Sequence, residues 1–99
     1  MKNGLPDSSS PFSSSGHHLA TISHEGRFWD VYLEFEEDPR QPTSFRARLC
    51  YLPGDPGDGE GAARTAIIVI EDTFEEAMLK ARGLDDRQLQ ALLRSALPD

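Results

Sequence analysis

Residues 27–37 alternate between apolar and polar side chains, as a β-strand with one buried face does. Residues 43–52 follow the same period of two. The intervening residues include Pro39 and Pro42, which interrupt strand pairing and favour a reversal of the chain. The two segments are therefore predicted to form an antiparallel hairpin. The side chains predicted to face the core are Trp29, Val31, Leu33, Phe35, Phe45, Ala47, Leu49 and Tyr51.

The opposite faces of this hairpin are complementary in charge. Asp30, Glu34 and Glu36 lie on the first strand, whereas Arg46 and Arg48 lie on the second. Opposite charges across neighbouring strands contribute about 0.2–1 kcal/mol per pair and help to select the register. We therefore interpret the two arginines first as sheet-stabilising residues, with a ligand-binding role as the alternative.

Two further segments have strand patterns. Residues 64–71 contain a continuous apolar run at 66–70, which predicts a strand buried on both faces and therefore central in the sheet or covered by helices. A weaker alternation at residues 19–24 predicts a short strand ahead of the hairpin. Residues 53–61 are rich in glycine and proline and are predicted to form a mobile loop.

After residue 71 the apolar period changes to that of an α-helix. Thr73 is predicted to cap a first helix, with Glu76 completing a capping box, and Gly83 to end it in the left-handed conformation. Asp85 and Gln88 are predicted to start a second helix with the same box. The apolar stripes are Phe74, Ala77, Met78 and Ala81 in the first helix and Leu89, Leu92, Leu93, Ala96 and Leu97 in the second.

These elements predict an α+β fold. The sheet is antiparallel, with three strands, or four if residues 19–24 take part, in β-β-β-α-α order and with both helices on one face. Residues 1–17 are rich in serine and are predicted to be a disordered tail, so residues 18–99 form the single domain. The chain has no secretory or transit pattern, and its longest apolar run is far shorter than a membrane span, so a cytoplasmic location is expected.

The net charge narrows the range of partners. With 10 Lys and Arg against 17 Asp and Glu, the formal charge is −7 at pH 7. This charge argues against direct binding of nucleic acid or of an anionic membrane. It suits a basic protein partner, and it also suits adaptation to a salty cytoplasm, in which case stability should rise steeply with salt.

No group of residues has the pattern of an active centre. A metal site would need His17, His18 and His24 to converge with a carboxylate such as Glu25, and two adjacent histidines are poorly placed to supply two ligands from one strand face. The loop carboxylates Asp55, Asp58 and Glu60 lack the spacing of a calcium loop. Cys50 has no neighbouring base in the sequence to activate its thiol. We expect no catalytic residue, no metal and no cofactor.

An interaction surface is the better-supported expectation. Phe28 and Tyr32 interrupt the polar face of the first strand and share that face with Leu52. Exposed aromatic side chains on a sheet face are typical of a docking surface, unless a helix or the leading strand covers them. The candidate surface consists of Phe28, Tyr32, Arg46, Arg48 and Leu52.

The expected function is that of a small, soluble, acidic, non-enzymatic protein-interaction module. The alternative is a small-molecule-binding protein, or a minor enzyme, with a pocket between sheet and helices. A protein partner is expected, and an exposed strand edge offers a route to a dimer.

Residues 28–82 carry a family resemblance. Asp72-Thr73 and Glu76-Ala77, at the start of the first helix after the strands, resemble the helix entry in the partial double-stranded-RNA-binding-like domain of the HicB antitoxin family. The resemblance implies a β-β-β-α unit and an acidic protein-binding module that masks a basic partner. The Pro-x-x-Gly-Cys turn typical of that family is absent, and only one more helix follows, so repressor activity does not carry over.

Overall fold

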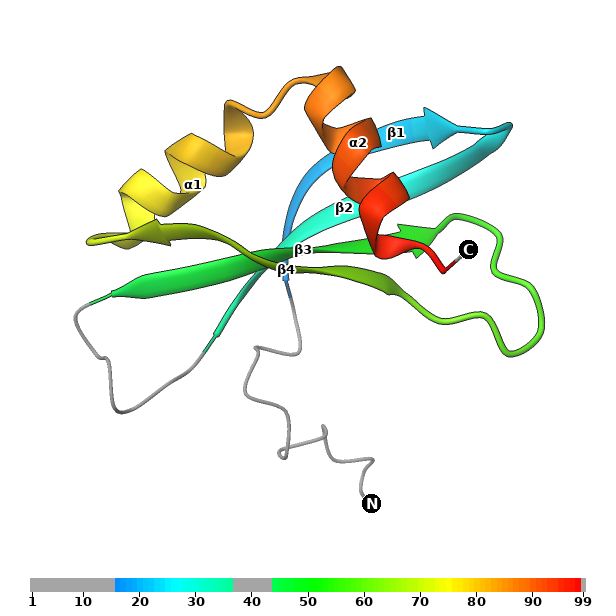
Figure 1. The fold of residues 1–99 in the computed structure, drawn as a ribbon, viewed down its shortest axis with the longest axis horizontal. Coiled ribbons are helices and arrows are strands. Elements are labelled where there is room, and N and C mark those ends of the chain that lie inside the picture. Colours follow the sequence, from blue (N-terminus) through cyan, green and yellow to red (C-terminus); the bar gives the residue numbers. More distant parts are fainter. Residues whose placement is uncertain (1–15, 37–43, 99) are drawn as a thin grey trace, which may run out of the picture.

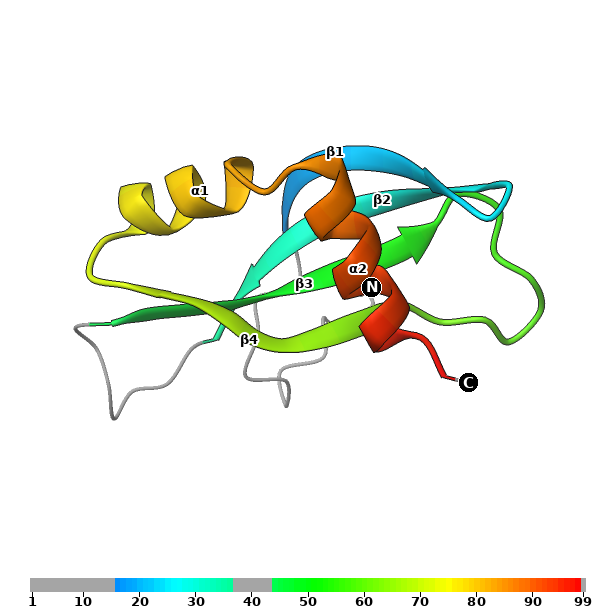
Figure 2. The same ribbon diagram turned by 45° about the horizontal axis from the view of Figure 1, so that its top comes forward.

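The computed structural model describes residues 16–36 and 44–98. Four strands form one antiparallel sheet in the order β1-β2-β3-β4, and two helices follow on one face of it (Figures 1 and 2). The predicted α+β fold is confirmed, with the leading segment present as a fourth strand. The elements are β1 (His17–His24), β2 (Arg27–Phe35), β3 (Phe45–Pro53), β4 (Ala63–Glu71), α1 (Phe74–Arg82) and α2 (Asp86–Ala96).

Two sequence predictions fall largely outside this description. Of the segment 1–17 that is predicted to be a disordered tail, residues 1–15 lie outside the described residues, and His17 is the first residue of β1. The proline-containing connector 38–42 between β2 and β3 also lies outside them. Both remain predictions.

The core lies between the helices and the sheet. Val31 and Leu33 are completely buried, and Trp29 is 4% exposed. All eight side chains predicted to face inward belong to this core or pack against it. The buried Tyr51 hydroxyl also donates a hydrogen bond of 2.8 Å to the Leu89 carbonyl, which ties α2 to the sheet.

The position of β4 corrects the prediction made from its apolar run. β4 is an edge strand and pairs with β3 alone. The helices cover one of its faces, where Val69 is 2% exposed, whereas Ile70 on the other face is 55% exposed. The prediction that β4 is buried on both faces was therefore wrong, because neither helix of the described residues lies on its second face. Helix cover is confirmed for the first face.

Both edge strands contain β-bulges. Between Arg48 and Cys50 the register shifts because β4 has one residue more than β3 in that interval, and a second shift lies beside it. Thr65 compensates for the disrupted ladder, since its Oγ1 accepts a hydrogen bond of 3.0 Å from the Leu49 N–H. β1 contains a similar shift. Bulges twist an edge strand away from further pairing, so both edges of this sheet are poorly suited to adding a strand.

The helix caps follow the sequence signals in part. Asp85 and Gln88 form the complete capping box that starts α2. Thr73 accepts a hydrogen bond from the Glu76 N–H at 3.0 Å, as predicted. The predicted capping box is not completed, because its second hydrogen bond differs. The Glu76 carboxylate accepts from the Thr73 hydroxyl at 3.2 Å in place of the Thr73 backbone N–H.

Gly83 ends α1 in a conformation that differs from the prediction. Its φ of −80° and ψ of −7° are right-handed. Its N–H donates to the carbonyls of Leu79 and Lys80, both at 3.1 Å, and so continues the helical hydrogen bonding. The prediction of a left-handed Gly83 was wrong. The chain reaches Asp85, the N-cap of α2, only two residues later and does so without the reversal that a left-handed residue produces.

Candidate functional site

The five residues of the candidate surface all lie on the sheet face that points away from the helices, which we call the open face. Residues directly opposite in an antiparallel ladder share a face, and side chains alternate along each strand. The β2–β3 register therefore carries Phe28, Tyr32, Arg46, Arg48 and Leu52 to this face, since the intervening side chains form the core beneath the helices. The structure therefore places the five residues of the candidate surface on one face of the sheet, as the alternation predicted.

Ion pairs occupy the middle of the open face. Glu34 is 7% exposed and accepts from Arg48 Nε at 2.9 Å and from Arg64 Nε at 3.2 Å. Glu36 accepts from Arg46 Nε at 2.8 Å. The pairing predicted for these carboxylates is confirmed, and the guanidinium charges are neutralised within the sheet.

Asp30 has different partners from those predicted. Its carboxylate accepts a hydrogen bond of 2.7 Å from the Thr21 hydroxyl and lies 3.2 Å from His18 Nε2. The Thr21 hydrogen bond, followed by the His18 contact, holds the pKa of Asp30 below its ordinary value. The prediction of an arginine partner was wrong for Asp30, because Leu52 occupies the opposing position on β3.

One end of the open face is apolar and is not covered by any residue that the structure describes. Phe28 is 67% exposed and Leu52 is 41% exposed. The Gly54 N–H donates to the Phe28 carbonyl at 2.9 Å and so continues the β2–β3 ladder by one position. Phe28 therefore lies opposite Gly54, and its side chain is the diagonal neighbour of Leu52. Together they form the apolar end of the open face.

The chain enters β1 across the middle of the same face. A Cβ atom on Gly16 would lie 3.0 Å from Tyr32 Cβ and 3.3 Å from Glu34 Cγ. The backbone of Gly16 therefore packs directly on these two side chains, and only glycine permits so close an approach. Tyr32 is half-buried as a result, and among the described residues the part of the candidate surface that stays exposed is Phe28 with Leu52.

Cys50 is enclosed and unreactive. It is 3% exposed, and burial raises its pKa to about 11, with the Glu34 carboxylate adding to the shift. A thiol with this pKa is almost wholly protonated at neutral pH and is a poor nucleophile.

The histidines do not converge on a metal site. The His17 ring packs edge-on against Phe35 and Phe74, with centroids 5.7 and 5.2 Å apart, and His24 Nδ1 lies 2.6 Å from Gln90 Oε1. Within residues 16–36 and 44–98, no three His, Cys, Asp or Glu side chains are grouped so that they could hold a metal ion.

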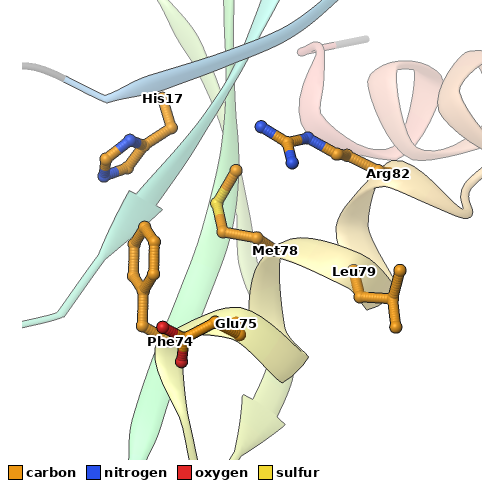
Figure 3. Close-up of a pocket in the computed structure, with 6 residues that line it drawn as sticks. All are labelled: His17, Phe74, Glu75, Met78, Leu79 and Arg82. Atoms are coloured by element: carbon orange, nitrogen blue, oxygen red, sulfur yellow. The ribbon is translucent and has the colours of Figure 1, made fainter.

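On the helix side, a groove runs between α1 and the start of β1 (Figure 3). It has a volume of about 540 Å³, and Met78 forms its floor, being 5% exposed. We call it the α1 groove. Its lining residues are His17, Phe74, Glu75, Met78, Leu79 and Arg82.

A second hollow, of about 420 Å³, lies at the end of α2. We call it the Trp29 hollow, because the buried Trp29 lines it and the indole Nε1 has no hydrogen-bond partner among the described residues. Its lining residues are Trp29, Glu60, Gly61, Ala62, Ala63, Arg64, Ala96, Leu97 and Pro98.

No family model, no curated protein and no solved structure matches this chain. None of the helices in the described part of the chain is long and apolar enough to cross a membrane.

A bidentate ion pair at the Trp29 hollow was missed by the sequence analysis. Arg27 donates to both carboxylate oxygens of Glu60 at 2.8 Å, and its guanidinium lies 5.1 Å from the centroid of the Trp29 ring. Arg27, and next the Gly57 N–H, lower the pKa of Glu60 to about 2. Glu60 lies in the segment that the sequence predicts to be a mobile loop, and 33 residues separate it from Arg27, so no local pattern could reveal the pair.

Proposed function

We propose that this chain is a non-enzymatic, cytoplasmic interaction module that binds a partner protein through the open face. The proposal rests on the exposure of Phe28 and Leu52, two diagonal neighbours on a sheet face that no helix of the described residues covers. Large apolar side chains grouped on an otherwise polar surface are typical anchors of a protein interface. The paired charges around them suit the polar rim of such an interface.

The charges of the fold indicate the chemistry of the partner. The open face is close to neutral, because its arginines pair with Glu34 and Glu36. Carboxylates are concentrated instead at the starts of the two helices, including Glu75, Glu76 and Asp86. Such a distribution supports a partner whose contact patch is apolar and whose remaining surface is basic, since unpaired charge steers association over a distance.

The resemblance to the HicB antitoxin family is part of this proposal. Elements β2, β3, β4 and α1 follow one another in the β-β-β-α order that the resemblance implies. An antitoxin-like module would mask a basic partner protein, which agrees with the negative charge of the chain.

Site-specific photo-crosslinking tests the open face as the docking surface. We expect p-benzoylphenylalanine at position 28 to crosslink one dominant partner, and the same probe at Arg87, an exposed residue of α2, to give no such product. Phe28→Ser with Leu52→Ser should weaken binding of that partner at least tenfold, which is about 1.4 kcal/mol. Crosslinks of equal yield from both positions, or none from position 28, would refute the proposal.

One observation favours a second candidate function, the binding of a small molecule in the Trp29 hollow. The unpaired indole N–H is buried, and an unsatisfied buried donor costs about 1–3 kcal/mol. A ligand with an apolar body and a carbonyl oxygen would suit this donor and the alanine, leucine and proline side chains around it.

The single tryptophan makes this candidate simple to test, because its indole N–H gives one resonance in the NMR spectrum. We expect titration with hexanamide to shift that resonance in a saturable way. Ala62→Phe, which fills part of the hollow from a half-exposed position, should abolish the shift. An unchanged indole resonance at millimolar hexanamide would eliminate this function.

A further inference from the structure

The outer side of α1 exposes an apolar residue that the fold of one chain does not use. Leu79 is 74% exposed, more than any other large apolar side chain in the described part of the chain. The buried residues of α1 are Ala77, Met78 and Ala81, whereas Leu79 stays largely exposed. Phe74, at the start of the helix, is also 36% exposed.

Leu79 lies beside the α1 groove, whose floor is apolar like the leucine side chain. Met78 forms its floor, with Phe74 and the His17 ring on one side and Arg82 and Leu79 on the other (Figure 3). A methionine floor adapts easily to the shape of an incoming apolar side chain. The groove can therefore take a side chain such as leucine.

Opposite charges stand at the two ends of this helix face. Glu75 and Arg82 are seven residues apart and so lie on the same side of α1, about 10 Å from each other along the axis. This separation is too long for an ion pair, and neither side chain has a charged partner within residues 16–36 and 44–98. The midpoint between them falls between Met78 and Leu79.

We propose that the α1 face is an interface between two copies of this chain, packed antiparallel about a twofold axis beside Leu79. In such an isologous contact, residue i meets residue j and j meets i. Glu75 then faces Arg82 of the partner subunit, and Arg82 faces Glu75 of the partner subunit. Leu79 of each copy enters the α1 groove of the other copy.

The charge pattern selects a second copy as the occupant. A helix with an acid at one end, a base at the other and an apolar residue between them is complementary to itself when reversed. The interface lies on the helix side, so it leaves Phe28 and Leu52 on the open face free. The proposal is therefore independent of the proposed function, and either can fail without the other.

Sedimentation equilibrium of the full chain provides the first test. We expect a reversible monomer–dimer equilibrium at micromolar to millimolar concentration, weakened by high salt because the ion pairs are exposed. Leu79→Ser should weaken the dimer at least tenfold, whereas Phe28→Ser with Leu52→Ser, the matched apolar-to-polar control, should leave it unchanged. A wild-type chain that is monomeric throughout would overturn the proposal, as would a dimer lost only in the control.

Charge exchange provides the second test. Glu75→Arg and Arg82→Glu should each give a chain that dimerises at least tenfold more weakly, because like charges then face each other. An equimolar mixture of these two variants should form a heterodimer, since each Arg then meets a Glu. Heterodimer formation excludes misfolding as the cause of the single-variant losses. Variants that sediment as the wild type, or a mixture that stays monomeric, would overturn the proposed arrangement.

Discussion

Tyr51 joins α2 to the sheet through one buried hydrogen bond, from its hydroxyl to the Leu89 carbonyl at 2.8 Å. Tyr51→Phe removes the donor and leaves the space filled, so we expect the free energy of unfolding to fall by about 1–2 kcal/mol. Urea unfolding followed by the fluorescence of Trp29 measures this change. Tyr32→Phe is the matched control, since the Tyr32 hydroxyl has no hydrogen bond within the described residues, and it should cost less than about 0.5 kcal/mol. Equal losses would contradict this role for Tyr51.

Cys50 gives the protein a defined pH dependence. Burial raises the pKa of its thiol from 9.0 to about 11 in the folded chain. Between pH 9 and 11 the unfolded chain has released the thiol proton, whereas the folded chain still keeps it. The contribution of the thiol to the free energy of unfolding is therefore fully present below pH 9 and is lost as the pH rises through 11. The full effect is about 2–3 kcal/mol.

Cys50→Ala isolates this effect from other titrating groups. We expect the unfolding free energy of the wild type, minus that of the variant, to decrease by about 2 kcal/mol between pH 8 and 11. Parallel pH profiles for the two proteins would show that the thiol keeps its ordinary pKa on folding.

At the scale of the elements, the bulge in β4 depends on Thr65. Its hydroxyl accepts from the Leu49 N–H at 3.0 Å and donates to the Ala66 carbonyl at 2.7 Å. Thr65→Val keeps the shape but leaves a buried N–H without an acceptor, so we expect a loss of about 1–3 kcal/mol in the free energy of unfolding. Thr65→Ser, which keeps the hydroxyl, should recover most of it in the same urea titration. A valine variant as stable as the serine variant would contradict this account.

The sequence predicts the strands and helices better than it predicts which segments pack against each of them. Alternation placed Trp29 and Leu33 in the core and Phe28 on the opposite face, because the side-chain period of a strand is a local property. It could not predict that β4 lies at an edge, since an apolar run is the same whether one or both faces are covered. The Arg27–Glu60 pair and the groove beside Leu79 were likewise out of reach, because both depend on the packing of segments distant in sequence.

At the scale of the whole molecule, two surfaces of different character lie on opposite sides of one sheet. The open face presents Phe28 and Leu52 among paired charges, and the helix side presents Leu79 between Glu75 and Arg82. If both proposals hold, a dimer through α1 would carry two open faces, and each could engage a partner. Two linked sites raise the avidity for a multivalent partner without any new contact.

The placement of the acidic residues decides between the two explanations of the negative charge. Glu75, Glu76 and Asp86 lie in the first turns of helices, where the helix dipole stabilises them by about 0.3–1 kcal/mol each. Glu34 and Glu60 are paired with arginines. Salt screens these favourable contacts as well as the repulsion between carboxylates, so we expect the unfolding free energy to change by less than about 1 kcal/mol between 0.1 and 1 M NaCl. Urea titrations at both salt concentrations measure it, and a rise of several kcal/mol would instead support adaptation to a salty cytoplasm.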